Sequence, residues 1–452
     1  MGKYQYSELE QQLNNVLQYQ NKELKNISFG NSNIEDIISS SEKLLLNLGY
    51  SLNDIKPVHD DTPMKVAVLP SWESLCLEAE KSVGSHCELE SIFTEQELNE
   101  NREAIKILNK EFNEIHKLDK TDIGIIACAG ILGAAIDILM VGIPQKTPNG
   151  LSAGTLSNYI RDLFDKKFPI EEMEKLANSK ICKVPYDAQD NRHTKEYVTG
   201  LSAYYHRLLS LGHDPLLGLL FGVTDILAGR MTTIDKKGKI VSQVMENYTD
   251  RREMDIFAAI AKQILHFKSD IMTSMGLPVP LMAVFNLFQF GSIGEEEQTI
   301  AEIVQGMYYE GYDFIHFCSM SIPTMIIEVI VRLGYALKRM KEGYTLNESL
   351  PFDLNRIHKP KLSTMLFVAH SSATAINAGK IYFTKNPMSI NYPQWIAFAK
   401  YSYKQLKWAI YEKEKMKNDF VLNNINQEFM DIYDDIERNF YLLNSKYIIV
   451  ME

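Results

Sequence analysis

Five ionisable residues stand in apolar stretches of this sequence, at spacings that could bring their side chains together. His206 and His213 are seven residues apart, and His266 and Asp270 are four apart. On a helix, each of these pairs would project from one face. Asp137 is the single charged residue of a long glycine-rich apolar run. Because imidazole and carboxylate groups bind zinc, manganese and iron, the five residues predict a divalent-metal centre.

A plainer interpretation applies to each histidine taken alone. A buried imidazole commonly forms a hydrogen bond with a backbone carbonyl and has no further role. The occurrence of several such residues on apolar helices favours metal binding, because buried charges are usually paired or coordinate a metal. His316 and His370 have no carboxylate at helical spacing and are expected in the core, whereas His193 lies in a polar stretch and should be solvated.

Two further acids are candidates for proton transfer. Asp214 follows His213 directly, and Asp225 is a lone acid among apolar residues. A metal ion lowers the pKa of a bound water, and a nearby carboxylate could accept the proton. No Ser/His/Asp triad can be assigned, and the chain contains no Walker A or G-x-G-x-x-G pattern, so a nucleotide site is not indicated.

The pattern of apolar residues predicts a mainly α fold with a large helical core. Apolar residues recur three and four apart in most segments, and alternating Val, Ile and Thr runs are scarce. Turn residues between short apolar pieces predict one β-hairpin near residues 232–242. The run 123–144 has almost no polar group, so protein or lipid should shield it on nearly every side.

Changes between polar and apolar composition divide the chain into three regions. We expect an amphipathic helical region over residues 1–120, an apolar helical core with the metal site over 121–385, and a helical region over 386–452. The amphipathic termini could assemble a homo-oligomer.

Composition narrows the classes of partner and the compartment. The net charge is -11 and no basic stripe is present, which argues against nucleic-acid binding. The five cysteines are scattered and form no C-x-x-C pair, as suits a reducing compartment. The N-terminal stretch lacks a signal-peptide pattern. We therefore expect the cytoplasm or the cytoplasmic face of the inner membrane.

The segments that carry these residues resemble the LexA-regulated, inner-membrane metal-dependent hydrolase family of bacteria. The similarity spans roughly residues 122–285 and rests on three segments, GILGAAIDIL, HRLLSLGHDPLLGLLFG and HFKSDIMTSMGLPVP. The family's second segment usually ends in Thr-His-Ser, where this chain has Gly212-His213-Asp214. The chain also resembles a set of uncharacterised bacterial proteins with the same apolar blocks. The resemblance implies a metal site more directly than it implies a substrate.

Three functions fit these observations. The first is a metal-dependent hydrolase of a phosphoester, such as a lipid headgroup, with zinc, manganese or iron held by Asp137, His206, His213, His266 and Asp270. The second is a non-enzymatic, membrane-associated effector or scaffold, in which the run 123–144 contacts membrane lipid. The third is a helical interaction protein whose acids and histidines satisfy one another in the core.

Overall fold

The structure is a computed structural model, and it describes residues 5–47, 65–147, 150–273, 275–294, 296–351, 359–444 and 447–451. The chain divides into two compact units. The first comprises Met1–Ile115 and Lys413–Glu452, and the second comprises His116–Glu412. The C-terminal boundary falls after η10 (Trp408–Glu412), so α14 (Tyr392–Lys407) belongs to the second unit and α15 (Lys413–Asn444) to the first.

The first unit is built mainly from long helices. Its α1 and α2 pack together, and its two short strands pair in parallel, Lys65 opposite Tyr447. Its elements are α1 (Glu8–Asn47), β1 (Lys65–Leu69), α2 (Trp72–Val83), η2 (Leu89–Ile92), α3 (Glu95–His116), α15 (Lys413–Asn444) and β6 (Tyr447–Met451).

The second unit contains a helical bundle and a lobe of shorter elements, and it carries all of the candidate site residues. Its helices are α4 (Lys120–Ile136), η3 (Asp137–Val141), α5 (Thr155–Lys167), α6 (Ile170–Asn178), η4 (Asn191–His193), α7 (His206–Leu209), η5 (Leu211–His213), η6 (Leu217–Leu219), α8 (Phe221–Ala228), η7 (Glu246–Arg251), α9 (Ile256–Met272), η8 (Met282–Leu287), α10 (Ile300–Tyr309), α11 (Phe314–Lys341), α12 (Leu346–Ser349), α13 (Lys359–Thr384), η9 (Pro387–Ser389), α14 (Tyr392–Lys407) and η10 (Trp408–Glu412). Its strands are β2 (Gln145–Thr147), β3 (Gly150–Ser152), β4 (Arg230–Ile234) and β5 (Ile240–Val244).

The predicted fold class is confirmed, since the chain is 71% helical. The expected hairpin is also present, formed by β4 and β5 in antiparallel register with Thr232 opposite Ser242. A second antiparallel pair, β2 and β3, and the parallel pair β1 and β6 were not predicted from the sequence.

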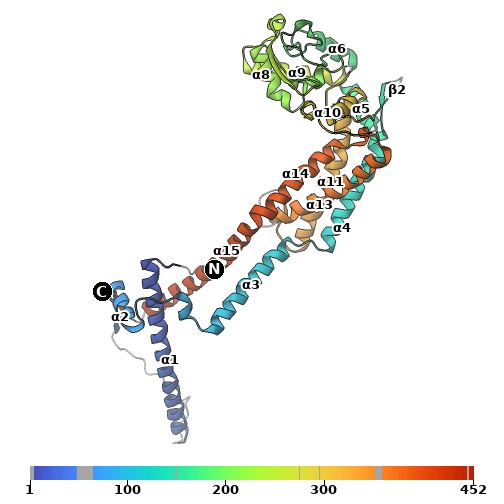
Figure 1. The fold of residues 1–452 in the computed structure, drawn as a ribbon. Helices are drawn as coiled ribbons and strands as arrows, with labels where there is room; N and C mark the ends of the chain where they lie inside the picture. The colour runs from blue at the N-terminus through green and yellow to red at the C-terminus, as the bar shows by residue number, and fades with distance from the viewer. Residues whose placement is uncertain are drawn as a thin grey trace. The chain divides into compact units, whose positions relative to one another are not determined.

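The bundle consists of α4, α11, α13 and α14, which run side by side (Figure 1). Helix α4 begins with a capping box, in which Asp119 accepts hydrogen bonds from the backbone of Thr121 and Asp122. A Cβ atom at Gly133 would lie 2.6 Å from the side chain of Ile327 on α11, so glycine is what permits the close packing of these two helices.

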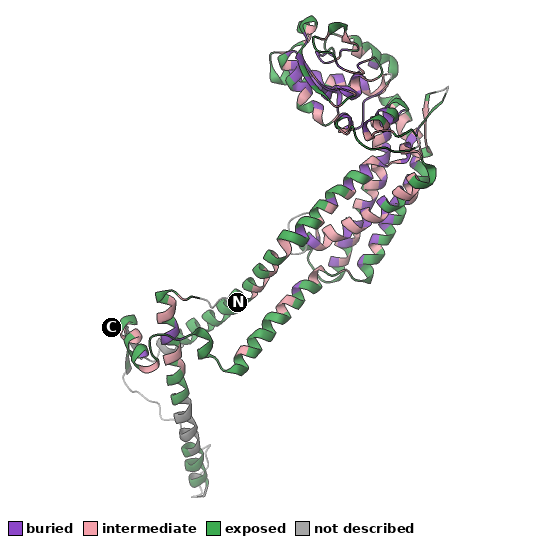
Figure 2. Cartoon of the chain, viewed as in Figure 1, coloured by how far each residue is buried: buried purple, intermediate pink, exposed green. Residues whose placement is uncertain are grey.

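The run 123–144 is covered by protein on only part of its surface. Ile131 is 63% exposed and Leu139 is 76% exposed. Figure 2 shows exposed residues along the outer side of the bundle helices. Two helical stretches, Glu95–Val141 and Phe314–Lys341, are long and apolar enough to cross a membrane by length and composition. Only 33% and 39% of their most apolar windows are buried inside the protein. The expected shielding of the run 123–144 is therefore incomplete within this chain.

Asp137 has partners of its own in the bundle. Its Oδ1 accepts a hydrogen bond from Asn391 at 2.7 Å, and its Oδ2 accepts one from Asn377 at 3.1 Å. Lys380 lies 3.2 Å from the same Oδ2. One cation and two amides thus compensate the buried carboxylate. The structure thus gives Asp137 partners in the bundle, and not the histidines with which it was predicted to bind a metal.

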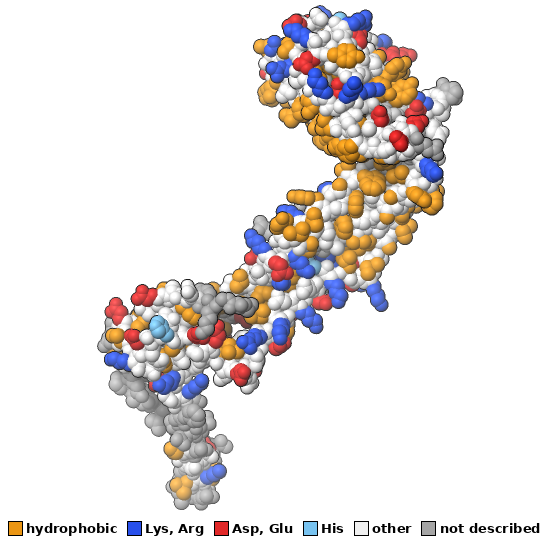
Figure 3. Space-filling view, in the orientation of Figure 1, with side chains coloured by type: hydrophobic (Ala, Val, Ile, Leu, Met, Phe, Trp, Pro, Cys, Tyr) orange, Lys and Arg blue, Asp and Glu red, His pale blue; other side chains and the backbone are white. Residues whose placement is uncertain are grey.

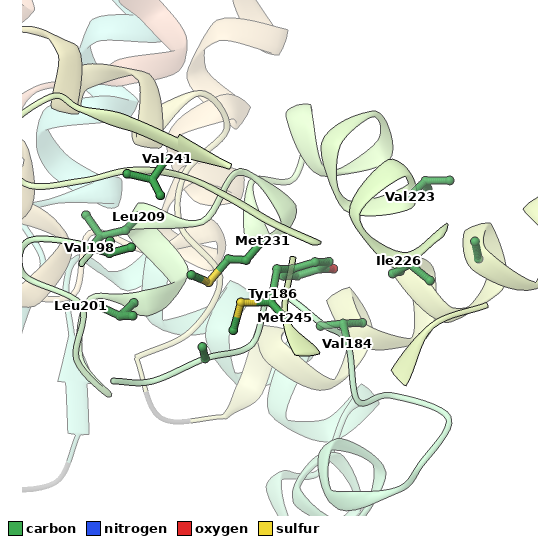
Figure 4. Close-up of a cluster of buried hydrophobic side chains, with 12 residues drawn as sticks. Val184, Tyr186, Val198, Leu201, Leu209, Val223, Ile226, Met231, Val241 and Met245 are labelled. Carbon is green, nitrogen blue, oxygen red and sulfur yellow. The ribbon is translucent and has the colours of Figure 1, made fainter. Parts of the chain in front are cut away.

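The lobe holds the remaining candidate residues around a core of its own. Tyr186, Leu209, Val223 and Met231 belong to this cluster of buried side chains (Figure 4). The isolated bridge between Ser210 and Thr233 ties the segment that carries His206 and His213 to strand β4. The hairpin and this core together fix the position of that segment.

Candidate metal centre

Helix α9 presents His266 and Asp270 on its buried face. The helix starts at an N-cap, Asp255, which accepts a hydrogen bond from Ala258 N at 2.9 Å. Its buried residues recur three and four apart, as a helix with one core-facing stripe requires: Ala259, Lys262, Gln263, His266, Ser269 and Asp270. The two candidate ligands therefore stand one turn apart in the interior.

His206 and His213 do not share one long helix, as their spacing had suggested. His206 is the first residue of the one-turn helix α7, and His213 is the last residue of the 3-10 turn η5. The chain bends between them at Ser210, and both imidazoles are buried. The ring centroids of His206 and His213 are 5.4 Å apart, and those of His213 and His266 are 5.0 Å apart.

Asp187 completes the cluster from a loop that follows α6. Its Oδ1 lies 3.3 Å from His206 Nε2 and 3.7 Å from His213 Nε2. On the other side, Asp270 Oδ2 lies 3.3 Å from His266 Nε2 and 3.7 Å from His213 Nε2. The side chains thus form two groups that share His213, and within each group the ligand atoms lie within 4.8 Å of one another.

These separations suit a metal ion. Atoms bonded at about 2.1 Å to one tetrahedral ion lie about 3.4 Å apart. The shortest contacts in the cluster, 3.3 Å on each side, are close to that value. Three imidazoles and two carboxylates are also the donor set that zinc, manganese and iron accept. The residues present therefore fit a divalent ion.

The hydrogen bonds of two histidines orient their Nε2 atoms into the cluster. His206 Nδ1 lies 2.9 Å from Ala203 O, and His266 Nδ1 lies 2.8 Å from Cys182 O. A carbonyl can only accept, so each Nδ1 carries a proton, and in the neutral imidazole each Nε2 keeps a lone pair. Backbone carbonyls hold metal-binding histidines in this way in many proteins.

Several buried atoms of the cluster have no hydrogen-bond partner among the described residues. They are His206 Nε2, both ring nitrogens of His213, His266 Nε2 and Asp270 Oδ2. Leaving a polar atom buried without a partner costs about 1–3 kcal/mol. Four of these five atoms point into one cluster. Coordination of a shared metal ion would give all four a partner and so remove this free-energy penalty.

Arg207 fixes the carboxylate of Asp270. Its Nη2 atom lies 3.0 Å from Asp270 Oδ1, and the same guanidinium donates to Thr273 Oγ1 at 2.9 Å and to Gly276 O at 3.3 Å. With Oδ1 held by Arg207, Oδ2 is the oxygen that faces His213 and His266. Arg207 was not recognised from the sequence, because its partners lie more than sixty positions away.

Tyr186 packs against the imidazoles and helps to link α9 to η5. The edge of its ring contacts His213 and His266, with centroid distances of 5.0 and 5.6 Å. Its hydroxyl donates to Gln263 Oε1, and Gln263 Nε2 donates to Gly212 O at 2.8 Å. A Cβ atom at Gly212 would lie 2.6 Å from the Tyr186 ring, so this close approach requires glycine.

The electrostatics of the cluster favour the ligand forms of His213 and Asp187. Burial lowers the pKa of His213 to about 4, so its imidazole is neutral near pH 7. Burial alone would raise the pKa of Asp187, but the neighbouring imidazoles of His206 and His213 hold it well below its usual value. Burial raises the pKa of Tyr186 well above its usual value, so this phenol stays protonated. A neutral imidazole and an ionised carboxylate are the forms that bind metal.

Asp187 was missed in the sequence, where it lies in a stretch of polar residues. A weak signal was present, because Asp187 stands among the apolar residues Val184, Pro185, Tyr186 and Ala188, which are buried in the structure. With its side chain 27% exposed, Asp187 is the most accessible member of the cluster. The centre therefore opens toward solvent on the side of Asp187.

The two acids expected to transfer protons have structural roles. Asp214 Oδ1 accepts hydrogen bonds from Leu216 N and Leu217 N, both at 2.9 Å, and so caps the turn after His213. Asp225 accepts hydrogen bonds from Thr232 N and Thr232 Oγ1, both at 2.8 Å, and so ties α8 to β4. Neither belongs to the two metal-capable groups found among the described residues.

The remaining histidines lie outside the cluster. His316 and His370 are buried in α11 and α13, as expected for core residues. His193 lies in a surface turn beside Tyr248 and Asn247. Comparison of the chain with protein-family models, with curated proteins and with solved structures finds no match.

Proposed function

We propose that this protein is a metal-dependent hydrolase whose centre is formed by Asp187, His206, His213, His266 and Asp270. The convergence of buried, unpartnered ligand atoms from a loop, two short turns and α9 carries this proposal. A bound divalent ion would supply a water of lowered pKa and polarise an oxygen of the substrate.

The protein's own residues perform three tasks in this proposal. His206 and His266 are held in one orientation by backbone carbonyls, and Asp270 is held by Arg207. The low pKa of Asp187 suits a ligand better than a proton acceptor, because a carboxylate of low pKa is a weak base. The buried imidazole of His213 keeps water away from the inner side of the centre.

A phosphoester is the substrate class that we propose, with a lipid headgroup as the favoured case. Leu216, Leu219 and Leu220 follow Asp214 directly, and all three are exposed. Phe257 and Ile264 are exposed on the outer side of α9, and α9 also packs against η6. Exposed apolar side chains on the segments that carry the ligands would favour an amphiphilic substrate over a fully soluble one.

The test is a phosphodiesterase assay on the full-length protein supplied with Zn²⁺, Mn²⁺ or Fe²⁺. A chromogenic phosphodiester and a phospholipid in mixed micelles serve as substrates. We expect hydrolysis of at least one substrate, its loss with a chelator, and its loss together with metal in His266→Ala. His193→Ala serves as the control and should retain both. Activity that survives complete removal of metal would refute the proposal.

The membrane-associated alternative is supported by a separate observation, the exposed apolar face of the bundle. Met325, Val329, Leu333 and Leu337 recur four residues apart on α11 and are all more than half exposed. Figure 3 shows hydrophobic side chains spread over the face of the bundle that is turned to the viewer. An apolar face of this size on a helix that is long enough to span a bilayer is typical of lipid contact.

Cell fractionation tests this second candidate. We expect the full-length protein in the membrane fraction, where it resists extraction with alkaline carbonate and is released by detergent. A Val329→Glu, Leu333→Glu double variant should be depleted from that fraction, whereas Lys341→Glu, at the end of the same helix, should not. Recovery of the wild-type protein in the soluble fraction as a monomer would exclude lipid contact by this face.

A further inference from the structure

The second unit contains a large apolar cavity that the proposed metal centre does not use. Its volume is about 1080 Å³, above the range of about 300–1,000 Å³ that is usual for small-molecule sites. Segments from η8, α10, η9 and the start of α14 line it, including Met282, Ile303, Val304 and Ile390. A cavity of this size and lining has room for a long hydrocarbon.

Two polar side-chain groups of the wall already have partners. Tyr312 donates its hydroxyl hydrogen to Ile390 O, and Trp395 Nε1 donates to Asn377 Oδ1 at 3.0 Å. A polar ligand would therefore find few partners in the interior, and an apolar ligand would leave none of these groups unsatisfied. The two charged residues of the wall, Glu296 and Lys385, are exposed and so lie at its opening.

The opening is continuous with exposed apolar side chains. Ile293 lines the cavity and is also exposed, and Phe290 is exposed close by in the sequence. On the other side, Ile381 lines the cavity and is followed by Tyr382 and Phe383, which are 78% and 84% exposed. A chain could pass from these side chains into the cavity without crossing a polar barrier.

We propose that this cavity binds one acyl chain of an amphiphile, with the polar head at the opening beside Glu296 and Lys385. Charges of opposite sign flank the opening, so the chain rather than the sign of the head would select the ligand. The site does not depend on metal, and the proposal stands whether or not the protein is a hydrolase.

A link to the metal centre is present in the wall itself. Met282 lines the cavity and belongs to the same cluster of buried side chains as Leu208 of α7, the helix that begins with His206. The segment of η8 that shapes the cavity thus packs against α7. A ligand in the cavity would therefore contact the segment that packs against α7.

Photolabelling of the full-length, metal-depleted protein in an amphipathic polymer tests the proposal. The probe is palmitic acid with a diazirine at the chain end, and a second arm uses the matching lysophosphatidylcholine. We expect labelled peptides from residues 279–304 and 381–395 with at least one probe. Labelling by the fatty acid indicates a free acid as ligand, and labelling by the lysolipid alone indicates a phospholipid. Labels spread evenly over α4 and α11, or no labels, would overturn the proposal.

Two variants on α10 sharpen this experiment. Val304→Trp places an indole in the cavity and should reduce labelling at least tenfold. Gly306→Trp is the matched control, because a Cβ atom there meets nothing within 4 Å, and it should label as the wild type does. Unlabelled octanoic, decanoic and dodecanoic acids should compete with affinities that rise about fourfold for each added methylene. Equal labelling of both folded variants, or competition independent of chain length, would contradict the proposal.

Discussion

Arg207 and Asp270 form a buried ion pair, with 3.0 Å between Nη2 and Oδ1, that leaves the second carboxylate oxygen of Asp270 facing two imidazoles. The pair joins α7 to α9, and each of these helices also contributes a histidine to the cluster. Partners of this kind hold a metal ligand in one orientation before the ion arrives.

Replacement of Arg207 by methionine should weaken metal binding about 10- to 100-fold, the range found when such supporting partners are removed. The physical reason is that Asp270 loses the cation that fixes its orientation. Titration calorimetry with Zn²⁺ measures the effect. The control is Arg192→Met, which removes a surface pair with Asp190 and should leave the affinity unchanged. Equal affinities in all three proteins would show that Arg207 does not support the centre.

Gly212→Ala should destabilise the lobe by about 1–3 kcal/mol, the usual cost of overpacking. The new methyl group would meet the Tyr186 ring at 2.6 Å, and the ring in turn contacts His213 and His266. Urea denaturation followed by circular dichroism measures the change. Gly306→Ala, in an open helical position, should instead stabilise by about 0.5–1 kcal/mol. A Gly212→Ala protein as stable as the wild type would mean that the contact with Tyr186 is looser than described.

Ionisation of the buried Asp225 should lower the free energy of unfolding as the pH rises from about 4 to about 6. Burial raises its pKa from 3.8 to about 6, so within this window the folded state holds a proton that the unfolded state has lost. The effect amounts to about 3 kcal/mol by the linkage between pKa and stability. Asp225→Asn keeps an acceptor for Thr232 N and cannot ionise.

The free energy of unfolding of Asp225→Asn, minus that of the wild type, should therefore increase between pH 4 and pH 6 and remain constant above that. Denaturation at several pH values gives this difference directly. The variant should also keep its metal content, because Asp225 contacts β4 rather than the cluster. A difference that does not change with pH would show that Asp225 is ionised without cost.

The sequence was sufficient for the parts of this account that depend on local spacing. Helical periodicity predicted the mainly α fold, and the four-residue spacing of His266 and Asp270 placed both on one face of α9. The turn residues near Gly238 predicted the hairpin of β4 and β5. These features follow from contacts between residues that are close in the chain.

What the sequence could not supply depends on residues that are far apart in the chain. Asp137 contacts Asn377, Lys380 and Asn391, which lie about 240 to 254 positions away, and no local sequence pattern predicts those partners. Asp187 looked like an ordinary loop residue, because only the fold brings it against His206. The bend at Ser210 likewise coincides with a bridge to Thr233, a residue far along the chain.

The metal content of the purified, full-length protein tests the central claim most directly. After incubation with Zn²⁺, Mn²⁺ or Fe²⁺ and removal of excess ion, elemental analysis should find about one or two ions per chain in the wild type and in His193→Ala. His213→Ala should hold none above background, because His213 belongs to both groups of ligands. A wild-type protein without metal, or a folded His213→Ala protein with as much metal as the wild type, would contradict the proposed centre.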